Sequence, residues 1–285
     1  MSRVRYNQRD RLPYLGGRIV QKQEILAAKG LARVVDDLEV LTTDSIRATT
    51  RPGDVPVGTS HLGGWPDLPE DVPWPAWDGK PLGFIAQFNL ADVHPFDPQN
   101  LLPSMGVLYF FYDATGETYG ERLEDRSGWK VMYSESHALK RVQATLPDSG
   151  RFRSCAVDFS KEVTLPLRPE VFGRGANWTS AEHTAYETLT SSQQGIKNRL
   201  LGHADAIQDD MHVQAYLLAK GQPLDTPLSE ALQRAAQNWI LLFQADSDVN
   251  AGMRWANNGR LYYWIERQAL QARQFDQVWM ILQSE

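Results

Sequence analysis

Two pairs of short apolar segments repeat along the chain, and they constrain its fold more than any other feature. The first pair is LGFIAQFNL (82–90) and GVLYFFYD (106–113), and the second is WILLFQADSD (239–248) and GRLYYWIE (259–266). Their short length and their richness in aromatic and branched residues predict buried β-strands. The chain must therefore fold around a sheet to which two distant regions contribute.

The two pairs also align with each other. A shift of 157 residues places Gln87 on Gln244, and a shift of 153 residues places Gly106 on Gly259, so the second connection is four residues shorter. Buried apolar strands can resemble each other through composition alone, which is the alternative reading. We expect an internal duplication of a β unit, with both copies sharing one core.

The remaining segments show helical and strand patterns around these four strands. Helices are expected over 181–201, 207–221, 226–237 and 268–275, and further strands over 157–167 and 278–282. The predicted fold class is α+β, mainly antiparallel β with peripheral helices.

Residues 50–81 form a segment of unusual composition. They contain seven prolines and five glycines, a density that excludes a helix and argues against a central strand. Trp65, Trp74 and Trp77 lie within it. Indole rings bury a large apolar area, so three of them are not expected in a solvent-exposed linker. We predict an ordered loop held in place by its aromatic side chains.

The N-terminal region differs from the rest of the chain. Apolar residues recur at three- and four-residue spacings from Arg18 to Leu41, which predicts one or two short helices. Before them lies a basic arm that contains Arg3, Arg5, Arg9, Arg11 and Arg18. This arm is either a solvated terminus or a contact for an acidic partner or nucleic acid. We divide the chain into an N-terminal helical extension, 1–56, packed on the same unit, and a main domain, 57–285.

Composition and charge narrow the function classes. No run approaches the roughly 18 apolar residues of a membrane helix, and the first residues lack a secretory signal, so we expect no membrane association. The single cysteine, Cys155, fits a reducing compartment, and we place the protein in the cytoplasm. Residues 61–285 carry 19 basic and 28 acidic side chains, a net charge of −9, which argues against nucleic-acid binding.

Two glutamines stand inside the apolar strands. Gln87 and Gln244 must have hydrogen-bond partners there, because an unpaired buried amide costs roughly 1–3 kcal/mol. With Asn89 and Asp246 they can line a polar pocket between the two repeats. The alternative is a structural bond to the glycine-rich loop.

The motif Asp246-x-Asp248-x-Asn250 spaces three oxygen-bearing side chains two residues apart. Such spacing suits a hard cation, but an EF-hand loop needs Gly at position 6 and Glu at position 12, where this chain has Ala251 and Asn257. We therefore expect these side chains to cap a turn, and no metal or other cofactor is predicted.

A third group of polar residues lies at 203–212. Histidine beside carboxylates can perform acid–base chemistry or hold a metal, but no pair here has the spacing of a metalloprotease. An acidic first turn of a helix explains the aspartates equally well. The predicted ligand-binding residues are Gln87, Asn89, His203, Gln208, Asp209, Asp246 and Asp248. The predicted partner-binding residues are Glu70, Asp71, Asp78, Asp205 and Asp210.

One long segment and three shorter ones carry a family resemblance. TSHLGGWPDLPEDVPWPAWDGKPLGFIAQFNL (59–90) resembles the opening signature of the YwqG-like family of bacterial proteins of uncharacterised function. The segments LLGHADAIQDDM (200–211), LLFQADSD (241–248) and LYYWIERQALQARQFDQVW (261–279) fit the same pattern in order. The resemblance implies a mainly β, single-domain fold and no established reaction.

Two functions of different classes follow from these features. Proteins of this type resemble cytosolic immunity proteins, so the first is a module that binds another protein, such as a cognate basic toxin, through its acidic surface. The second is an enzyme or small-ligand protein with a pocket between the repeats. Because no Gly-x-Ser-x-Gly, P-loop, dinucleotide or His-Glu-x-x-His motif is present, we expect binding rather than turnover.

Overall fold

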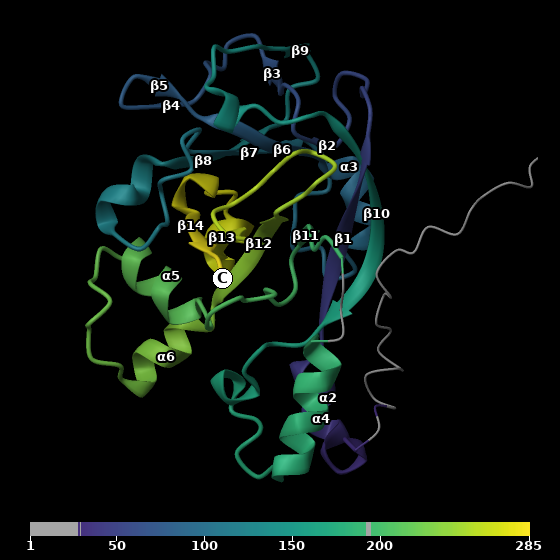
Figure 1. The fold of residues 1–285 in the computed structure, drawn as a ribbon, viewed down its shortest axis with the longest axis vertical. Helices are drawn as coiled ribbons and strands as arrows, with labels where there is room; N and C mark the ends of the chain where they lie inside the picture. Colours follow the sequence, from purple (N-terminus) through teal and green to yellow (C-terminus); the bar gives the residue numbers. More distant parts are fainter. Residues whose placement is uncertain (1–27, 29, 192–194) are drawn as a thin grey trace, which may run out of the picture.

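A computed structural model describes residue 28, residues 30–191 and residues 195–285. Its centre is a ten-stranded antiparallel sheet that curls into a nearly closed barrel (Figure 1), in the order β14-β13-β12-β11-β1-β10-β2-β6-β7-β8. The strands are β1 (Thr43–Pro52), β2 (His61–Leu62), β6 (Gly83–Asn89), β7 (Val107–Tyr112), β8 (Trp129–Ser134), β10 (Cys155–Thr164), β11 (Arg199–Leu200), β12 (Trp239–Asp246), β13 (Arg260–Glu266) and β14 (Trp279–Gln283). Two small ribbons lie outside it and pair β3 (Asp67–Pro69) with β9 (Leu139–Arg141) and β4 (Ala76–Trp77) with β5 (Lys80–Pro81).

Short helices surround the sheet, so the predicted α+β class, mainly antiparallel, is confirmed. The α-helices in the described residues are α2 (Val35–Leu41), α3 (Leu90–Val93), α4 (Ser180–Ser191), α5 (His212–Ala219), α6 (Glu230–Ala236) and α7 (Arg267–Gln271). The 3-10 turns are η1 (Ala32–Val34), η2 (His94–Phe96), η3 (Leu123–Ser127), η4 (Asp148–Gly150), η5 (Pro169–Phe172) and η6 (Phe275–Gln277). In Figure 1, α2 and α4 lie together at one end of the molecule, where they share a small apolar cluster of their own. None of the described helices has the length and apolar character needed to span a bilayer.

The sheet is built from two equivalent halves. The first half is β2, β6, β7 and β8 beyond β10, and the second is β11, β12, β13 and β14 beyond β1. Gln87 pairs with Tyr109 in the first half, as Gln244 pairs with Tyr262 in the second. Each half also has a bulge at the same place, between residues 84 and 86 of β6 and between residues 241 and 243 of β12. The predicted duplication is therefore confirmed strand by strand.

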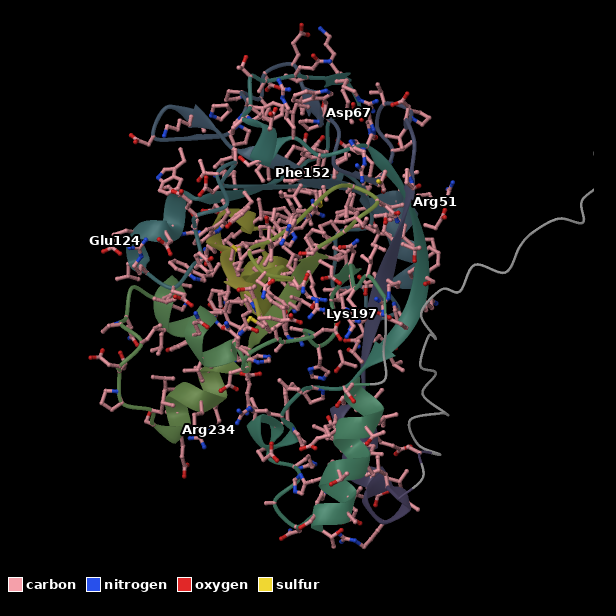
Figure 2. The ribbon with its side chains drawn as sticks, in the orientation of Figure 1. Arg51, Asp67, Glu124, Phe152, Lys197 and Arg234 are labelled. Atoms are coloured by element: carbon pink, nitrogen blue, oxygen red, sulfur yellow. The ribbon has the colours of Figure 1, made fainter. Side chains whose placement is uncertain are left out.

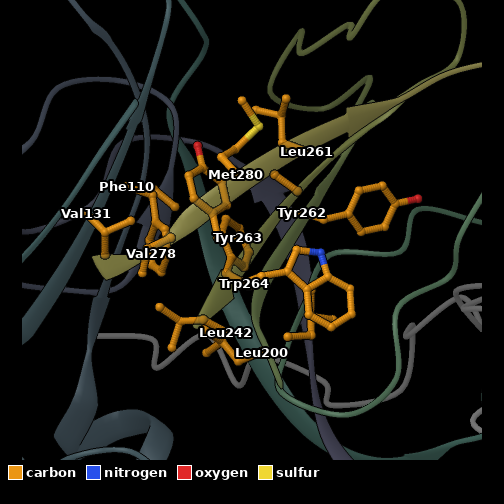
Figure 3. Packing of buried hydrophobic residues seen from close by; sticks show 14 of the residues in the cluster. Phe110, Val131, Leu200, Leu242, Leu261, Tyr262, Tyr263, Trp264, Val278 and Met280 are labelled. Atoms are coloured by element: carbon orange, nitrogen blue, oxygen red, sulfur yellow. The ribbon is translucent and has the colours of Figure 1, made fainter. Parts of the chain in front are cut away.

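Aromatic side chains from both halves meet in one core (Figure 3). The ring centroid of Phe110 lies 4.7 Å from that of Phe243 and 5.0 Å from that of Tyr263. Tilted and edge-on contacts at these distances stabilise aromatic pairs beyond the area that they bury. The shared core joins the two halves into one unit.

The two terminal strands of the sheet, β8 and β14, approach each other through side chains. The indoles of Trp129 and Trp279 lie 5.0 Å apart, and Trp129 Nε1 donates to the carbonyl of Val278 at 3.1 Å. We call this meeting line the seam, because side chains and not a backbone ladder join the two strands there.

Several predicted boundaries were wrong. Residues 43–52, assigned to a helical extension, form β1 inside the sheet, where Ile46 and Ala48 join the core while Ser45 and Arg47 bond to the buried Glu162. His61 and Leu62 form a central strand, since only two residues there need to pair. The predicted helices are shorter: residues 199–200 pair as β11, α5 starts at His212, and α6 starts after its cap, Ser229. The basic arm lies outside the described residues.

Candidate functional site

The buried amide of Gln87 fastens the glycine-rich loop to β6. Its Oε1 accepts the Asp67 N–H at 2.7 Å, and its Nε2 donates to the Thr59 carbonyl and to Asp67 Oδ2, both at 2.9 Å. The side chain is fully buried. The amide therefore has partners for its acceptor and its donor group, and these are the structural bonds to the glycine-rich loop that the sequence left as an alternative.

Gln244 repeats this arrangement in the second half. It accepts the Asp205 N–H at 2.9 Å and donates to the Lys197 carbonyl at 2.6 Å and to Asp205 Oδ2 at 3.0 Å. Residues 59–67 and 197–205 are thus equivalent loops at a shift of 138 residues, a repeat that the sequence comparison missed. Figure 2 labels one residue of each loop, Asp67 and Lys197, which lie in different parts of the molecule.

Asn89 and Asp246 end the equivalent strands β6 and β12. Asn89 caps α3 by accepting the Ala91 N–H at 3.1 Å. Asp246 accepts the Lys197 N–H at 2.7 Å and pairs with Arg260 at 2.9 Å, while its burial raises the pKa of the carboxyl. Each side chain is bonded within its own half, so the structure does not bring these residues to one shared cavity.

Asp248 caps the turn that follows β12. Its Oδ1 accepts the Asn250 N–H at 2.8 Å, and its Oδ2 accepts from Thr50 Oγ1 and Asn198 Nδ2, also at 2.8 Å. Among the described residues, no group of three or more His, Cys, Asp or Glu side chains is placed to hold a metal ion. The geometry of the Asp246-x-Asp248-x-Asn250 motif is that of a turn.

The 203–212 cluster is held by separate local bonds. His203 Nε2 lies 2.8 Å from the Leu41 carbonyl, and burial lowers the pKa of this imidazole to about 4, so it is neutral and donates its N–H. Asp209 pairs with Arg168, whereas Gln208 donates to the Ser284 carbonyl at 2.9 Å.

The two predicted partner-binding aspartates of this region are half-buried. Asp210 lies 2.8 Å from His212 Nδ1. Asp205 is 2.7 Å from the guanidinium of Arg199, which also pairs with Glu162 and is itself 1% exposed. Breaking a buried pair of this kind is strongly destabilising. The carboxylate of Asp205 is therefore engaged in structural bonds within the protein.

The other three predicted partner-binding residues lie together. Glu70, Asp71 and Asp78 are exposed on one segment, 70–82, which we call the Trp–Pro arm. Trp74 anchors the arm: its ring lies 5.6 Å from that of Phe111, and its Nε1 donates to the Leu82 carbonyl at 2.9 Å. The arm contains the β4–β5 hairpin that projects from the barrel in Figure 1.

Two pockets flank the Trp–Pro arm. The seam pocket has a volume of about 470 Å³, and its walls include Pro73, Trp74, Arg126, Lys130, Phe275 and Val278. The hairpin pocket has a volume of about 630 Å³, and its walls include Trp77, Lys80, Pro81, Thr115, Arg122 and Pro147. Both volumes fall in the range of ligand sites, and Leu82 lines both pockets.

The pockets exist because the two halves cover their outer faces differently. Between its loop 197–205 and β12, the second half contains α5 and α6, whereas the connection between the equivalent loop and β6 in the first half is formed largely by the Trp–Pro arm. The α5 helix packs its buried side chains on β12 and β14. A proline-rich segment cannot form such a helix, so the arm covers the first half as a thin strap. Sequence reasoning found the aromatic loop but not the pockets, which depend on the missing helix.

Two cationic side chains, Arg126 and Lys130, line the seam pocket, although the domain as a whole is acidic. The Arg126 guanidinium lies 5.9 Å from the ring centroid of Trp129 and 5.7 Å from that of Trp279, and it donates to the carbonyl of Val278 at 2.6 Å. Lys130 is exposed next to it. Such a rim favours an anionic group over the apolar floor.

Fold and site together define a class: a duplicated antiparallel β protein with a recessed, aromatic surface on one half. The chain belongs to the family described as "Domain of unknown function (DUF1963)", whose match spans residues 60–284. YwqG-like domains fall in that family, so the match agrees with the resemblance seen in the sequence. No protein of curated function matches the chain.

Proposed function

We propose that the protein binds and neutralises another protein, as an immunity protein does with a cognate bacterial toxin. The observation that carries the proposal is the Trp–Pro arm, a segment that lines two pockets and carries three exposed acidic side chains. Exposed charges beside recessed aromatic side chains are the composition expected of a protein-binding surface, because aromatic anchors supply affinity and charges select the partner.

Charge adds to this argument. The net charge of −9 over residues 61–285 attracts a basic partner and speeds encounter, an effect that salt screens beyond about 8 Å at physiological ionic strength. A toxin directed at nucleic acid or nucleotides has such a basic surface. The alternative, an enzyme with a pocket between the repeats, loses support because Gln87 and Asp246 are bonded within their own halves.

The test is co-expression with the protein encoded beside this gene, made under an inducible promoter. We expect the wild-type chain to bind that protein and protect the cells. A variant with Glu70→Lys, Asp71→Lys and Asp78→Asn should protect less and associate more slowly. Asparagine is used at Asp78 because this residue has a φ of 48°, which asparagine tolerates.

A matched control separates the arm from total charge. The changes Glu39→Lys, Glu187→Lys and Asp225→Asn alter the net charge equally at exposed positions elsewhere. We expect this variant to bind and protect like the wild type. Equal loss in both variants would show that only net charge matters, and failure of the wild type to bind or protect would refute the proposed function.

A further inference from the structure

We propose that the seam pocket binds a small molecule that carries an anionic group on a flat aromatic ring. Aromatic carboxylates and nucleoside phosphates share this chemistry, and the two are separated by experiment. The inference goes beyond the proposed function and does not rest on it, because no protein partner is needed to fill the pocket. It also uses none of the residues that the sequence predicted for a ligand.

The first anchor for the anion is Arg126. Its guanidinium donates to the backbone carbonyls of Val278 and Asp276 and lies over the indoles of Trp129 and Trp279, so its position is fixed. Within the described part of the chain, no carboxylate forms an ion pair with it within 4.0 Å. Partial burial lowers the pKa of Arg126 more than the charge of Asp276 raises it, so the cation is only partly compensated. A bound anion supplies the missing partner.

The second anchor is Lys130 on β8. It lies directly opposite Phe111 of β7, so the two side chains share one face of the sheet. Trp74 packs on the same face, with its ring centroid 5.6 Å from that of Phe111. Lys130 is exposed, and no described residue forms an ion pair with it. The pocket thus places an uncompensated ammonium beside a half-buried indole.

The walls of the pocket define the body of the ligand. Trp74 and Pro73 of the arm line it, as does Phe275 of η6. A half-buried indole offers a flat surface for an aromatic ring, and the volume of about 470 Å³ suits a small molecule. Among the charged side chains of the lining, two cations stand against one carboxylate, Asp276, so the pocket favours an anion over a cation.

The hairpin pocket provides an internal comparison. Its lining has two cations, Lys80 and Arg122, against four carboxylates, and Arg122 pairs with Asp125 at 3.1 Å. The larger pocket therefore has no excess of positive charge, although both pockets lie against the same arm. An anion should discriminate between them, which makes Lys80 a matched control for Lys130.

Isothermal titration calorimetry of the full-length chain tests the inference with two pairs of probes. Indole-3-carboxylate is compared with indole-3-carboxamide, and adenosine 5′-monophosphate with adenosine, so that each pair differs in the anionic group. We expect at least one anion to bind with a Kd below about 1 mM and its neutral counterpart to bind at least about tenfold more weakly. The anion that binds identifies the carboxylate or the phosphate as the preferred group.

Variants then locate the site. Arg126→Gln should weaken the bound anion at least about tenfold, because a hydrogen bond to a charged group is lost. Trp74→Leu removes the flat ring and should weaken it at least about threefold. Lys130→Gln should also weaken it at least about threefold, and it takes no partner from the fold. Lys80→Gln, with the same loss of charge in the hairpin pocket, should bind the anion as the wild type does.

Three results would overturn the inference. The first is that neither anion binds with a Kd below about 1 mM, or that the neutral compounds bind as tightly as the anions. The second is that Lys130→Gln and Arg126→Gln both bind the anion like the wild type. The third is equal weakening by Lys80→Gln and Lys130→Gln, which would show a general attraction of charge and no specific site.

Discussion

Replacing Gln87 with methionine removes its amide while keeping the length of the side chain. The structure shows which of its partners would lose their hydrogen bond. The Thr59 carbonyl keeps a contact with His61 Nδ1 at 3.1 Å, and the Asp67 carboxylate keeps the guanidinium of Arg141 at 2.8 Å. The Asp67 N–H loses the bond that the structure shows for it. One orphaned buried donor costs about 1–3 kcal/mol, and the weakened bonds add about 1 kcal/mol, so we expect a loss of about 2–4 kcal/mol.

The same change at Gln244 should cost more. The Asp205 carboxylate keeps Arg199, but the Asp205 N–H and the Lys197 carbonyl both lose the bonds that the structure shows for them. Two orphaned groups cost about 2–6 kcal/mol, so we expect Gln244→Met to exceed Gln87→Met by about 1 kcal/mol or more.

Urea unfolding followed by tryptophan fluorescence, with circular dichroism as a second probe, measures both losses. The comparison is valid where the two probes coincide and the dependence on urea is unchanged. A loss below about 1 kcal/mol at either site, or the reverse order, would refute the assignment of these amides as structural fasteners. Retained stability with lost partner binding in Gln87→Met would make that amide a ligand group.

Three further predictions concern buried groups. Burial lowers the pKa of His203 to about 4, so below about pH 6.5 the unfolded chain takes up a proton that the folded chain does not. The free energy of unfolding should therefore fall by up to about 3 kcal/mol as the pH drops from about 6.5 to 4. Urea titrations at these two pH values should show a smaller fall for His203→Gln. Gly120→Ala places a Cβ within 1.8 Å of a carbonyl oxygen and should cost several kcal/mol in thermal unfolding, whereas Gly116→Ala, also at positive φ but in open space, should cost about 1 kcal/mol. Arg199→Met removes a buried cation from Glu162 and Asp205, which keep Arg47 and Lys197, so it should cost about 3 kcal/mol, at the low end for a broken buried pair. Arg234→Met in an exposed pair should cost less than about 1 kcal/mol, and equal midpoints would refute this ranking.

The sequence predicted the four apolar strands because each is buried on both faces and reads as an uninterrupted hydrophobic run. It did not predict β1, whose TDSIRATTRP has few apolar residues. Ser45 and Arg47 on this strand bond to the buried carboxylate of Glu162. Ile46 and Ala48 reach the apolar core, but the other buried contacts of the strand are polar. Its hydrophobic pattern is therefore too short to be recognised, and its position depends on partners more than 100 residues away.

The candidate site was predicted only in part for a similar reason. The pattern Leu-x-Gly-x-x-Asp occurs at 62–67 and again at 200–205, and it was the available signal for the equivalent loops. Three identities in the nine residues 59–67 and 197–205 are too few to stand out without the structure. The exposed acidic residues of the arm were predicted as partner contacts. That the same arm lines two pockets could not be predicted, because the pockets depend on tertiary packing.

The two halves keep the same internal bonds and differ on their outer faces, which is what the proposed binding surface on one half requires. In each half a glutamine holds an aspartate N–H, and a tyrosine hydroxyl donates to the carbonyl of the same aspartate at 2.7 Å, Tyr109 in the first half and Tyr262 in the second. Changes there disturb the sheet itself. Asp71 and Asp78 lie outside this frame, where exposed substitutions cost within about 0.5 kcal/mol of stability. Substitutions at these exposed positions of the arm should therefore change its surface while the duplicated barrel stays folded.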